Sequence, residues 1–479
     1  MDMQTSNYIH GQWVTGDRNI PDVNPSDTRE IIAEFSQASE AQVEEAISAA
    51  AAAQPIWAGS GLEQRYQVLM SIGTALMDRS AELGELLCRE EGKTLPEGKG
   101  EVYRAGQFFT YYAAEVLRQM GDLCDSVRPG VEVQVAREPV GVIGIITPWN
   151  FPTALPSWKI APAIAYGNAV VWKPANLTPA SAVALMEIIA AQDLPDGLVN
   201  MVMGAGRSVG EAMITSKGVD AITFTGSLAT GRRIAEAAAV NLTKVQMEMG
   251  SKNPLVVLDD ADLDTAVSCA VNGAFGSTGQ KCTASSRIIV TRGIHDQFVE
   301  AMRKAMENLV VGHALDEKTQ IGPAVDAGQL EQNLHYLEVG RQEGAELVCG
   351  GERLELASPG YYMNPALFIN GNNAMQINTD EIFGPLTCVL KAEGYEEALA
   401  MANDTEFGLT SSVVTRSLSK ANHFKKHSKT GCVMINLPTS GTDYHVPFGG
   451  RKHSSYGSRE QGQYAAEFYT QVKTVYVKA

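Results

Sequence analysis

The stretch Ala221-Ile-Thr-Phe224-Thr-Gly226-Ser227-Leu-Ala-Thr-Gly231 indicates the fold class of this 479-residue chain. A short apolar strand runs into a Gly-Ser turn, and a helical segment opens at that turn. The same order of strand, turn and helix recurs from residue 143 to about residue 258. This alternation predicts a parallel sheet covered by helices, which is an α/β fold.

The rest of the chain contributes elements of both kinds. A second α/β stretch is expected from Pro254 to about residue 435, whereas the first ~120 residues are largely helical in pattern. Residues 131–137 alternate with period two and lead into 140–146, which predicts an antiparallel pair that projects from the body. The expected strands are 142–147, 169–172, 199–203, 221–224, 244–247, 253–258, 288–290, 387–390 and 467–477, and the expected helices are 41–53, 62–77, 81–91, 101–120, 181–192 and 231–239.

The composition is that of an acidic globular protein of two or three domains. Apolar residues make up 44% and charged residues 19%, and the formal net charge is −17. Nucleic acids and anionic membranes require basic surfaces, so neither is an expected partner. No segment approaches the ~18 uninterrupted apolar residues of a membrane span, and the N-terminus lacks the pattern of a signal peptide. We therefore expect a cytoplasmic protein.

The seven cysteines favour reduced thiols over a disulfide framework, because their number is odd and no CxxC occurs. No Cys/His cluster is present either, so no metal is expected. Cys282 has a distinctive setting, Gly276-Ser-Thr-Gly-Gln-Lys-Cys282-Thr-Ala. Small polar neighbours let a substrate approach this thiol closely, as a nucleophile requires. For a cysteine taken alone, a buried structural thiol is the alternative.

Further segments combine with Cys282 and the Gly226-Ser227 turn. They are Thr147-Pro-Trp-Asn150-Phe-Pro152, Glu248-Met-Gly-Ser-Lys-Asn-Pro254 and Glu381-Ile-Phe383-Gly-Pro385. In order and spacing, over essentially the whole chain, they resemble the aldehyde dehydrogenase superfamily. The resemblance implies NAD or NADP as cofactor, a small aldehyde as substrate, and a homodimer or homotetramer. It also implies a Rossmann-like cofactor domain (1–125 and 143–250), an α/β catalytic domain (251–445) and a small β oligomerisation arm (126–142 and 460–479).

The resemblance assigns catalytic roles to four residues. Cys282 attacks the aldehyde carbon to give a thiohemiacetal, and the Asn150 amide and the Cys282 backbone N–H hold the oxyanion. Hydride transfer to the cofactor leaves a thioester, and Glu248, whose apolar neighbours are expected to raise its pKa, activates water for hydrolysis. Lys159 matches a lysine that supports the site electrostatically. Taken alone, Asn150 reads as a turn residue, Glu248 as an ion-pair member and Lys159 as a surface charge.

Two helix starts mark the expected cofactor site. Gly204-Ala-Gly206-Arg-Ser-Val-Gly210 is one residue longer than the GxGxxG fingerprint and is a weak signal alone. Ser227 opens a helix whose free amides suit a pyrophosphate, or it is an ordinary N-cap. Asn176 stands where NAD-preferring relatives carry Glu, so use of NADP beside NAD is expected. By resemblance the cofactor residues are Thr147, Trp149, Lys173, Asn176, Gly206, Gly210, Gly226, Ser227, Gly231, Glu381 and Phe383.

A short carboxylated semialdehyde is the expected substrate. Gly276 stands where relatives with apolar substrates carry an aromatic ring, so the tunnel opens there. Arg104 either holds the substrate carboxylate or is a surface arginine paired with Glu101. The stretches 149–176 and 279–284 are similar to the α-ketoglutaric semialdehyde (2,5-dioxopentanoate) dehydrogenases of bacterial sugar-acid catabolism. The expected substrate residues are Arg104, Gln107, Phe151, Trp158, Gly276 and Phe448.

Two other functions stay open. Succinate or glutarate semialdehyde dehydrogenase is the nearer alternative, although Trp158 stands where the succinate enzymes often carry Arg. A non-catalytic structural or binding protein of the same fold is the remote one. The joint presence of Cys282, Glu248 and Asn150 favours an enzyme.

Overall fold

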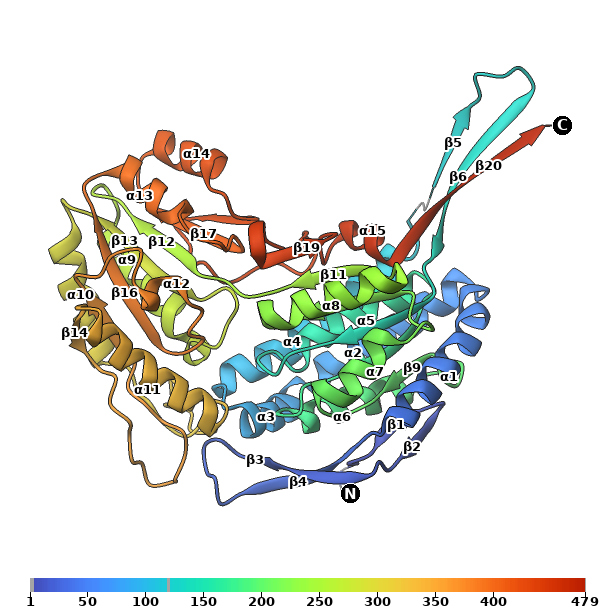
Figure 1. The fold of residues 1–479 in the computed structure, drawn as a ribbon, viewed down its shortest axis with the longest axis horizontal. Coiled ribbons are helices and arrows are strands. Elements are labelled where there is room, and N and C mark those ends of the chain that lie inside the picture. Colours follow the sequence, from blue (N-terminus) through green and yellow to red (C-terminus); the bar gives the residue numbers. More distant parts are fainter. Residues whose placement is uncertain (1–3, 119–120, 479) are drawn as a thin grey trace.

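Two sheets, each flanked by helices, organise the chain, and a narrow β arm projects from the body (Figure 1). The computed structural model describes residues 4–118 and 121–478. Across these ranges, no helix combines the length and the apolar character needed to cross a membrane.

The larger sheet has the strand order β19-β11-β10-β7-β8-β9-β1-β2. Its interior, from β11 to β9, is parallel, and the strands at both edges are antiparallel to their neighbours. The bounds are β1 (Asn7–Ile9), β2 (Gln12–Val14), β7 (Val142–Ile146), β8 (Ala169–Lys173), β9 (Val199–Met201), β10 (Ala221–Thr225), β11 (Lys244–Glu248) and β19 (Ser455–Gly457).

Helices from the first half of the chain flank this sheet (Figure 1). Polar caps define two of them: Ser39 and Gln42 form a capping box at the start of α1, and Ser227 accepts from the backbone N–H of Thr230 at the start of α8. Trp57 and Trp172 are fully buried in the shared core. The bounds are α1 (Glu40–Ala58), α2 (Leu62–Asp78), α3 (Ser80–Glu91), α4 (Leu95–Glu115), α5 (Ala154–Ala165), α6 (Pro179–Ala190), α7 (Glu211–Thr215) and α8 (Leu228–Asn241).

The second sheet has the order β14-β15-β16-β13-β12-β17-β18 and is parallel except for β14. Successive side chains of β12 enter two different cores, with Leu255 in one and Val256 in the other, so both faces are apolar. The strands are β12 (Asn253–Val257), β13 (Ser285–Thr291), β14 (Glu346–Cys349), β15 (Ala366–Ile369), β16 (Leu386–Ala392), β17 (Thr410–Val414) and β18 (Cys432–Ile435); the helices are α9 (Leu263–Phe275), α10 (His295–Glu307), α11 (Ala327–Gln342), α12 (Gln376–Thr379), α13 (Tyr395–Asn403) and α14 (Leu418–His427).

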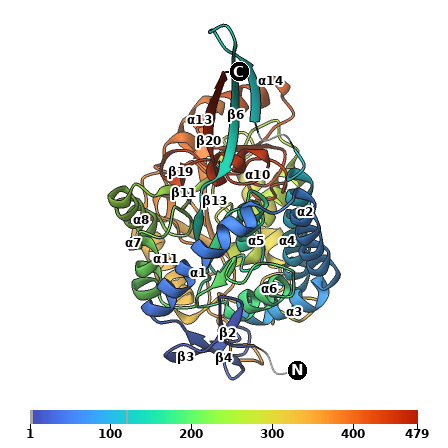
Figure 2. The same ribbon diagram turned by 90° about the vertical axis from the view of Figure 1, so that its right-hand side faces the viewer.

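Two smaller antiparallel sheets complete the fold. The arm consists of β5 (Gly121–Asp125), β6 (Val131–Pro139) and β20 (Thr470–Lys478), with β6 in the middle. Figure 2 shows it at the opposite end of the molecule from β3 (Arg18–Val23) and β4 (Ile31–Gln37), which pair with each other. Short α15 (Ala466–Tyr469) leads into β20.

Most of the predicted strands and helices are confirmed within a few residues, but three expectations need correction. Residues 140–146 do not pair with 131–137. They form β7, a buried interior strand, whereas β6 pairs with β5 and β20. The N-terminal segment 7–37 contains four strands that the helical prediction omitted. The helix expected over 101–120 ends at Glu115, and residues 119–120 lie outside the described ranges.

Candidate active site

The candidate site lies where the strand order of the larger sheet reverses. The chain runs from β7 to β8 and β9 on one side, and then places β10 and β11 on the other side of β7. In open α/β sheets, ligands bind beyond the carboxyl ends of the strands at such a point. A cavity of about 360 Å³ lies there, formed by the loops after β7, β10 and β11 together with the second α/β unit. It is lined by Pro148, Trp149, Asn150, Leu155, Thr225, Gly226, Ser227, Met249, Gly250, Cys282, Gln329, Gln332, Glu381 and Phe383.

A strained loop carries Cys282 into this cavity. Ser277 and Gly279 have positive φ values of 50° and 69°. The Glu97 carboxylate fixes Ser277 by accepting hydrogen bonds from its backbone N–H (2.7 Å) and hydroxyl (3.0 Å). A Cβ at Gly279 would lie 2.3 Å from the carbonyl oxygen of Gly384, so this position requires glycine. Such strain persists where the surroundings over-determine the backbone, and it is concentrated at functional sites.

The loop after β7 brings Asn150 to the thiol. Asn150 is 3% exposed, and its Nδ2 donates a 3.0 Å hydrogen bond to the carbonyl oxygen of Gln280, two residues before Cys282. From the other side, Asn253 donates a 2.8 Å bond to the carbonyl oxygen of Cys282. Asn150 and the half-buried Cys282 line the same cavity, and an oxyanion site requires such an amide donor near the thiol.

The resting thiol of Cys282 is protonated. Burial, followed by the nearby carboxylates of Glu381 and Glu248, raises the pKa of Cys282 to about 12. The thiolate is the nucleophilic form, so this cysteine needs a base that removes its proton as it reacts.

Glu248, the last residue of β11, is a carboxylate suited to proton transfer. Burial raises the pKa of Glu248 well above its usual value, the Glu460 charge raises it further, and Ser455 and Lys159 oppose the shift. The direction is the one expected from its apolar neighbours in the sequence. Oε2 accepts a 2.6 Å hydrogen bond from Ser455, and Oε1 has no partner among the described residues. A carboxylate with a raised pKa is a stronger base, and its free oxygen can accept a proton.

Lys159 lies behind the cavity and not in its lining. It is fully buried, so the surface-charge alternative is wrong. Its ammonium group pairs with Glu460 and donates a 2.8 Å hydrogen bond to the hydroxyl of Thr223. Lys159 therefore acts on Glu248 through their electrostatic coupling and not by direct contact.

The predicted cofactor residues near the thiol surround the cavity. Glu381 accepts a 2.8 Å hydrogen bond from the backbone N–H of Ser251, and burial raises its pKa to about 7. The Phe383 ring, at a positive φ of 60°, meets Trp149 edge-on at 5.5 Å. Gly226 and Ser227 complete this group in the same lining.

The remaining cofactor residues lie at and after the end of β8 and in the helical turn Gly206–Gly210 that precedes α7. A Cβ at Gly206 would meet nothing within 4 Å, and the buried Oδ1 of Asn176 has no partner in the described ranges. Lys173 packs beside Gly210, and burial lowers its pKa to about 8. An open glycine turn, an orphaned amide and a buried lysine fit the hydroxyls and phosphates of a dinucleotide.

Two predicted cofactor residues make internal contacts instead. The hydroxyl of Thr147 accepts a 2.9 Å hydrogen bond from the indole N–H of Trp172. A Cβ at Gly231 would lie 2.3 Å from the sulfur of Met249, so this glycine permits close packing of α8. Both residues shape the site from behind.

Two predicted substrate residues, Trp158 and Phe448, belong to an aromatic path that starts at Glu248. A Cβ at Gly449 would lie 2.7 Å from Oε1 of Glu248, and Phe448 precedes that glycine. Ring contacts then link Phe448 to Trp158 (5.5 Å), Trp158 to Phe108 (5.6 Å) and Phe108 to Tyr444 (6.5 Å).

Arg104 stands at the far end of this path, with its guanidinium 5.4 Å from the centre of the Tyr444 ring. Gln107, one turn further along α4, is half-buried. The alternative pairing of Arg104 with Glu101 does not occur, because Glu101 pairs with Lys93. Phe151 lies under the Lys93 ammonium group, 3.9 Å from the ring centre.

Several residues of the site were not predicted. Gln329 and Gln332 reach the cavity from α11, Ser455 donates a hydrogen bond to Glu248, and the Tyr444 ring lies under the Arg104 guanidinium group. Nothing in their local sequence marks them, since each is an ordinary polar residue far from the motifs. Lys281 is different, because it directly precedes Cys282; its amine lies 2.9 Å from where a Cβ of Gly276 would stand. The amine of Lys281 therefore occupies the space beside Gly276.

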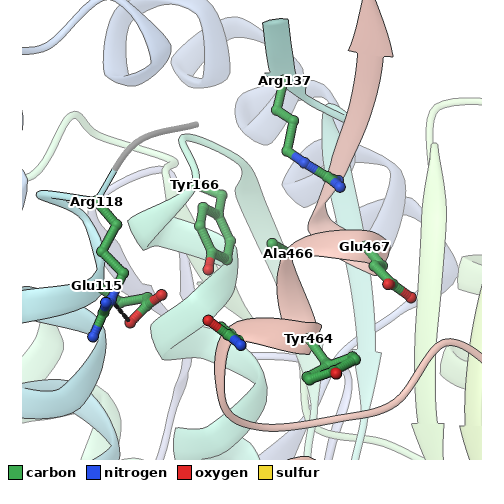
Figure 3. A pocket seen from close by; sticks show the side chains of 8 residues that line it. Glu115, Arg118, Arg137, Tyr166, Tyr464, Ala466 and Glu467 are labelled. Carbon is green, nitrogen blue, oxygen red and sulfur yellow. Dashed lines mark hydrogen bonds and ion pairs between the residues drawn. The ribbon is translucent and has the colours of Figure 1, made fainter. Parts of the chain in front are cut away.

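A separate pocket lies at the base of the arm and contains none of the predicted site residues. Its volume is about 270 Å³. Figure 3 shows Arg137 from the arm above Tyr166 and Glu467, while Arg118 forms a 2.6 Å ion pair with Glu115. The charged side chains of this pocket are both acidic and basic, and its lining includes none of the catalytic residues Cys282, Glu248 and Asn150. This pocket is therefore distinct from the candidate active site.

Comparison with known proteins agrees with this geometry. A sequence profile described as the Aldehyde dehydrogenase family matches residues 13–475. The chain is 42% identical to an alpha-ketoglutaric semialdehyde dehydrogenase of Bacillus subtilis (98% of each chain covered) and 39% identical to an alpha-ketoglutarate semialdehyde dehydrogenase of Haloferax volcanii (98% of each). Betaine aldehyde dehydrogenase of Staphylococcus aureus, solved with NAD+, superposes with a TM-score of 0.97 at 33% identity, covering 100% of this chain and 95% of the other. The chain belongs to the aldehyde dehydrogenase family.

Proposed function

We propose that this NAD(P)-dependent aldehyde dehydrogenase oxidises α-ketoglutaric semialdehyde to α-ketoglutarate. The observation that carries the proposal is Arg104 at the far end of the aromatic path, and Lys281, whose amine lies beside Gly276, is a second cation near Cys282. In a chain with a net charge of −17, cations at these two positions favour an anionic substrate tail. The Bacillus subtilis relative bears the same activity in its name.

A second feature suits the keto group of this substrate. The indole N–H of Trp158 is buried and has no hydrogen-bond partner within the described residues. A buried donor without a partner costs free energy unless a ligand or water accepts from it. An α-keto oxygen is such an acceptor, whereas succinic and glutaric semialdehyde have no keto group. The ranking therefore places α-ketoglutaric semialdehyde first and these two next.

The proposed chemistry proceeds at Cys282 in two stages. As the sulfur bonds to the aldehyde carbon, the thiol proton leaves to solvent water, and Asn150 with the Cys282 N–H holds the oxyanion of the thiohemiacetal. NAD(P) supplies the hydride acceptor when bound. Glu248 then takes a proton from water, the hydroxyl oxygen attacks the thioester carbon, and the carbon–sulfur bond breaks. Glu248 returns its proton to the leaving thiolate, and the carboxylic acid loses its own proton to solvent as it departs as the carboxylate. Aldehyde, water and oxidised cofactor thus yield carboxylate, reduced cofactor and two protons.

Both NAD and NADP are proposed as cofactors. Trp149, Glu381 and Phe383 would hold the nicotinamide end, and the Gly226-Ser227 turn the pyrophosphate. Lys173 and Asn176 would meet the adenine ribose. Asn176 carries no charge that would repel a 2′-phosphate, and its free oxygen accepts from a ribose hydroxyl.

Betaine aldehyde is the second candidate, because the rings of Trp158, Phe448 and Tyr444 resemble the aromatic surroundings that quaternary ammonium groups favour. Against it, Arg104 already covers Tyr444, and a fixed cation repels a cationic substrate.

The test is a panel of kcat/KM values with α-ketoglutaric, succinic and glutaric semialdehyde, betaine aldehyde and butanal, each with NAD and NADP. The proposal predicts that the three carboxylated aldehydes lead, with α-ketoglutaric semialdehyde first. A higher kcat/KM for betaine aldehyde or butanal would overturn it.

We also propose that the arm joins subunits into a homodimer or homotetramer. The edge strand β20 exposes backbone groups of the sheet, and large apolar side chains stand out on the arm: Leu123 is 71% exposed and Tyr476 61%. Light scattering of the wild type should show an oligomer, and Tyr476→Lys should shift it toward a smaller species. A monomeric wild type would exclude this role.

A further inference from the structure

A buried ion pair clamps the segment that carries Asn150. Lys93 lies between α3 and α4 and is 2% exposed, and its ammonium group sits 2.8 Å from Oε2 of Glu101. The same ammonium group donates a hydrogen bond to the backbone carbonyl of Asn150 and covers the ring of Phe151 at 3.9 Å.

Glu101 holds the other end of this segment. Its Oε1 accepts hydrogen bonds from the backbone N–H groups of Thr153 (3.0 Å) and Ala154 (3.1 Å). These are the first amides of α5, where the Thr153 side chain supplies no cap. Lys93 therefore fixes the carbonyl at the start of the turn and Glu101 fixes the amides at its end.

The charge distribution explains why the clamp is rigid. Burial lowers the pKa of Lys93, but Glu101 and Glu91 more than offset this, so its pKa lies above the ordinary value and it stays charged. Glu91 stands 3.7 Å from the ammonium group. A buried charge that is paired and hydrogen-bonded holds its partners in one geometry.

We propose that Lys93 and Glu101 are positioning residues for aldehyde oxidation, which set the Asn150 amide at the oxyanion. The inference rests on the proposed role of Asn150. The side chain of Asn150 projects from a backbone fixed at its carbonyl by Lys93, and its amide reaches the Cys282 loop at Gln280. A donor displaced by about 1 Å loses much of its effect on the transition state.

The test compares the rate of the first turnover, measured as the pre-steady-state burst of NADH, in a double-mutant cycle of Lys93→Met and Asn150→Ala. Each single variant should slow the burst, Lys93→Met by about 10–100-fold and Asn150→Ala by about 100–1,000-fold. In the Asn150→Ala background, Lys93→Met should cost little more, because no donor is left to misplace. Lys99→Met, on the exposed side of α4, is the matched control and should not change the burst.

Lys93→Met leaves the Glu101 carboxylate buried without its cation, so Lys93→Met/Glu101→Gln provides a neutral pair for the same measurement. It should unfold cooperatively near the wild-type temperature and still show the slow burst, whereas Glu101→Gln alone keeps Lys93 on Asn150 and should slow the burst by less than Lys93→Met does. Equal slowing by Lys93→Met with and without Asn150 would show a general structural role and overturn the inference. A normal burst in Asn150→Ala would instead overturn the proposed role of Asn150. The series is run with both α-ketoglutaric semialdehyde and butanal, so the result does not depend on which aldehyde is the substrate.

Discussion

The hydroxyl of Ser455 donates a 2.6 Å hydrogen bond to one carboxylate oxygen of Glu248, and the other oxygen has no partner among the described residues. One oxygen is therefore anchored and the other is available to water. Ser455 comes from β19, which pairs antiparallel with β11, so the register of the sheet edge sets this contact.

Replacing Glu248 by Gln should impair deacylation more than acylation. The amide keeps the shape and the contact with Ser455, but it cannot take a proton from water. Rapid mixing with aldehyde and NAD should give a burst of NADH followed by a steady state slower by about 100-fold or more. Glu63→Gln, exposed on α2, serves as control, and equal slowing of both phases would remove Glu248 from the role of deacylation base.

Removing the Ser455 hydroxyl should shift the pH profile of the deacylation rate to higher pH. The hydrogen bond lowers the pKa of Glu248, so Ser455→Ala raises that pKa. The ionised carboxylate is the active form, and deacylation is lost as the pH falls through the pKa. The acidic limb should therefore shift by about 1–2 pH units to higher pH, equivalent to a hydrogen bond of about 1.5–3 kcal/mol to a charged group. A limb that stays in place or moves to lower pH would contradict the assignment.

The preference for NADP should decline as the pH rises through about 8. Burial lowers the pKa of Lys173 to about 8, so its charge is present below that pH and lost above it. A 2′-phosphate is bound by the charged form, and between pH 7 and pH 9.5 the ratio of the dissociation constants of NADP and NAD should rise. Lys173→Met should remove this dependence and Lys217→Met, which is exposed, should keep it. A ratio that is constant with pH in the wild type would show that Lys173 does not meet the phosphate.

Removing either proposed substrate cation should affect carboxylated aldehydes selectively. Loss of a charge-assisted contact in a desolvated site costs about 2–4 kcal/mol, or about 30–1,000-fold in kcat/KM. Arg104→Ala and Lys281→Met should each raise KM for α-ketoglutaric semialdehyde and leave butanal nearly unchanged. Arg118→Ala, exposed at the end of α4, is the control. Equal losses for both substrates would mean that the two cations are structural.

The parallel sheets were predictable because their strands are short apolar runs, such as 142–146 and 253–257, that helical segments separate. The pairing of β6 with β20 could not be predicted in this way. The two strands pair in a register that joins Val131 to Lys478, and no local pattern encodes a contact across most of the chain. Local apolar runs identify a strand, but the strand beside it is decided by the whole topology.

The same contrast applies to the site. Cys282, Glu248 and Asn150 stand in recognisable motifs, and the structure brings them to one place. Lys93 and Glu101 were missed because a buried lysine or glutamate looks in sequence like a solvated one, and only packing shows that the two charges meet beneath the turn after Asn150.

The central claim is that the aldehyde is oxidised while bonded to Cys282. The most direct measurement is the intact mass of the Glu248→Gln variant after mixing with NAD and α-ketoglutaric semialdehyde, followed by peptide mapping. The account predicts one acyl group per subunit, attached to Cys282. The double variant Glu248→Gln/Cys282→Ala should form neither the adduct nor NADH. An adduct on another of the seven cysteines, or NADH formation by the Cys282→Ala protein at a rate near that of the wild type, would contradict it.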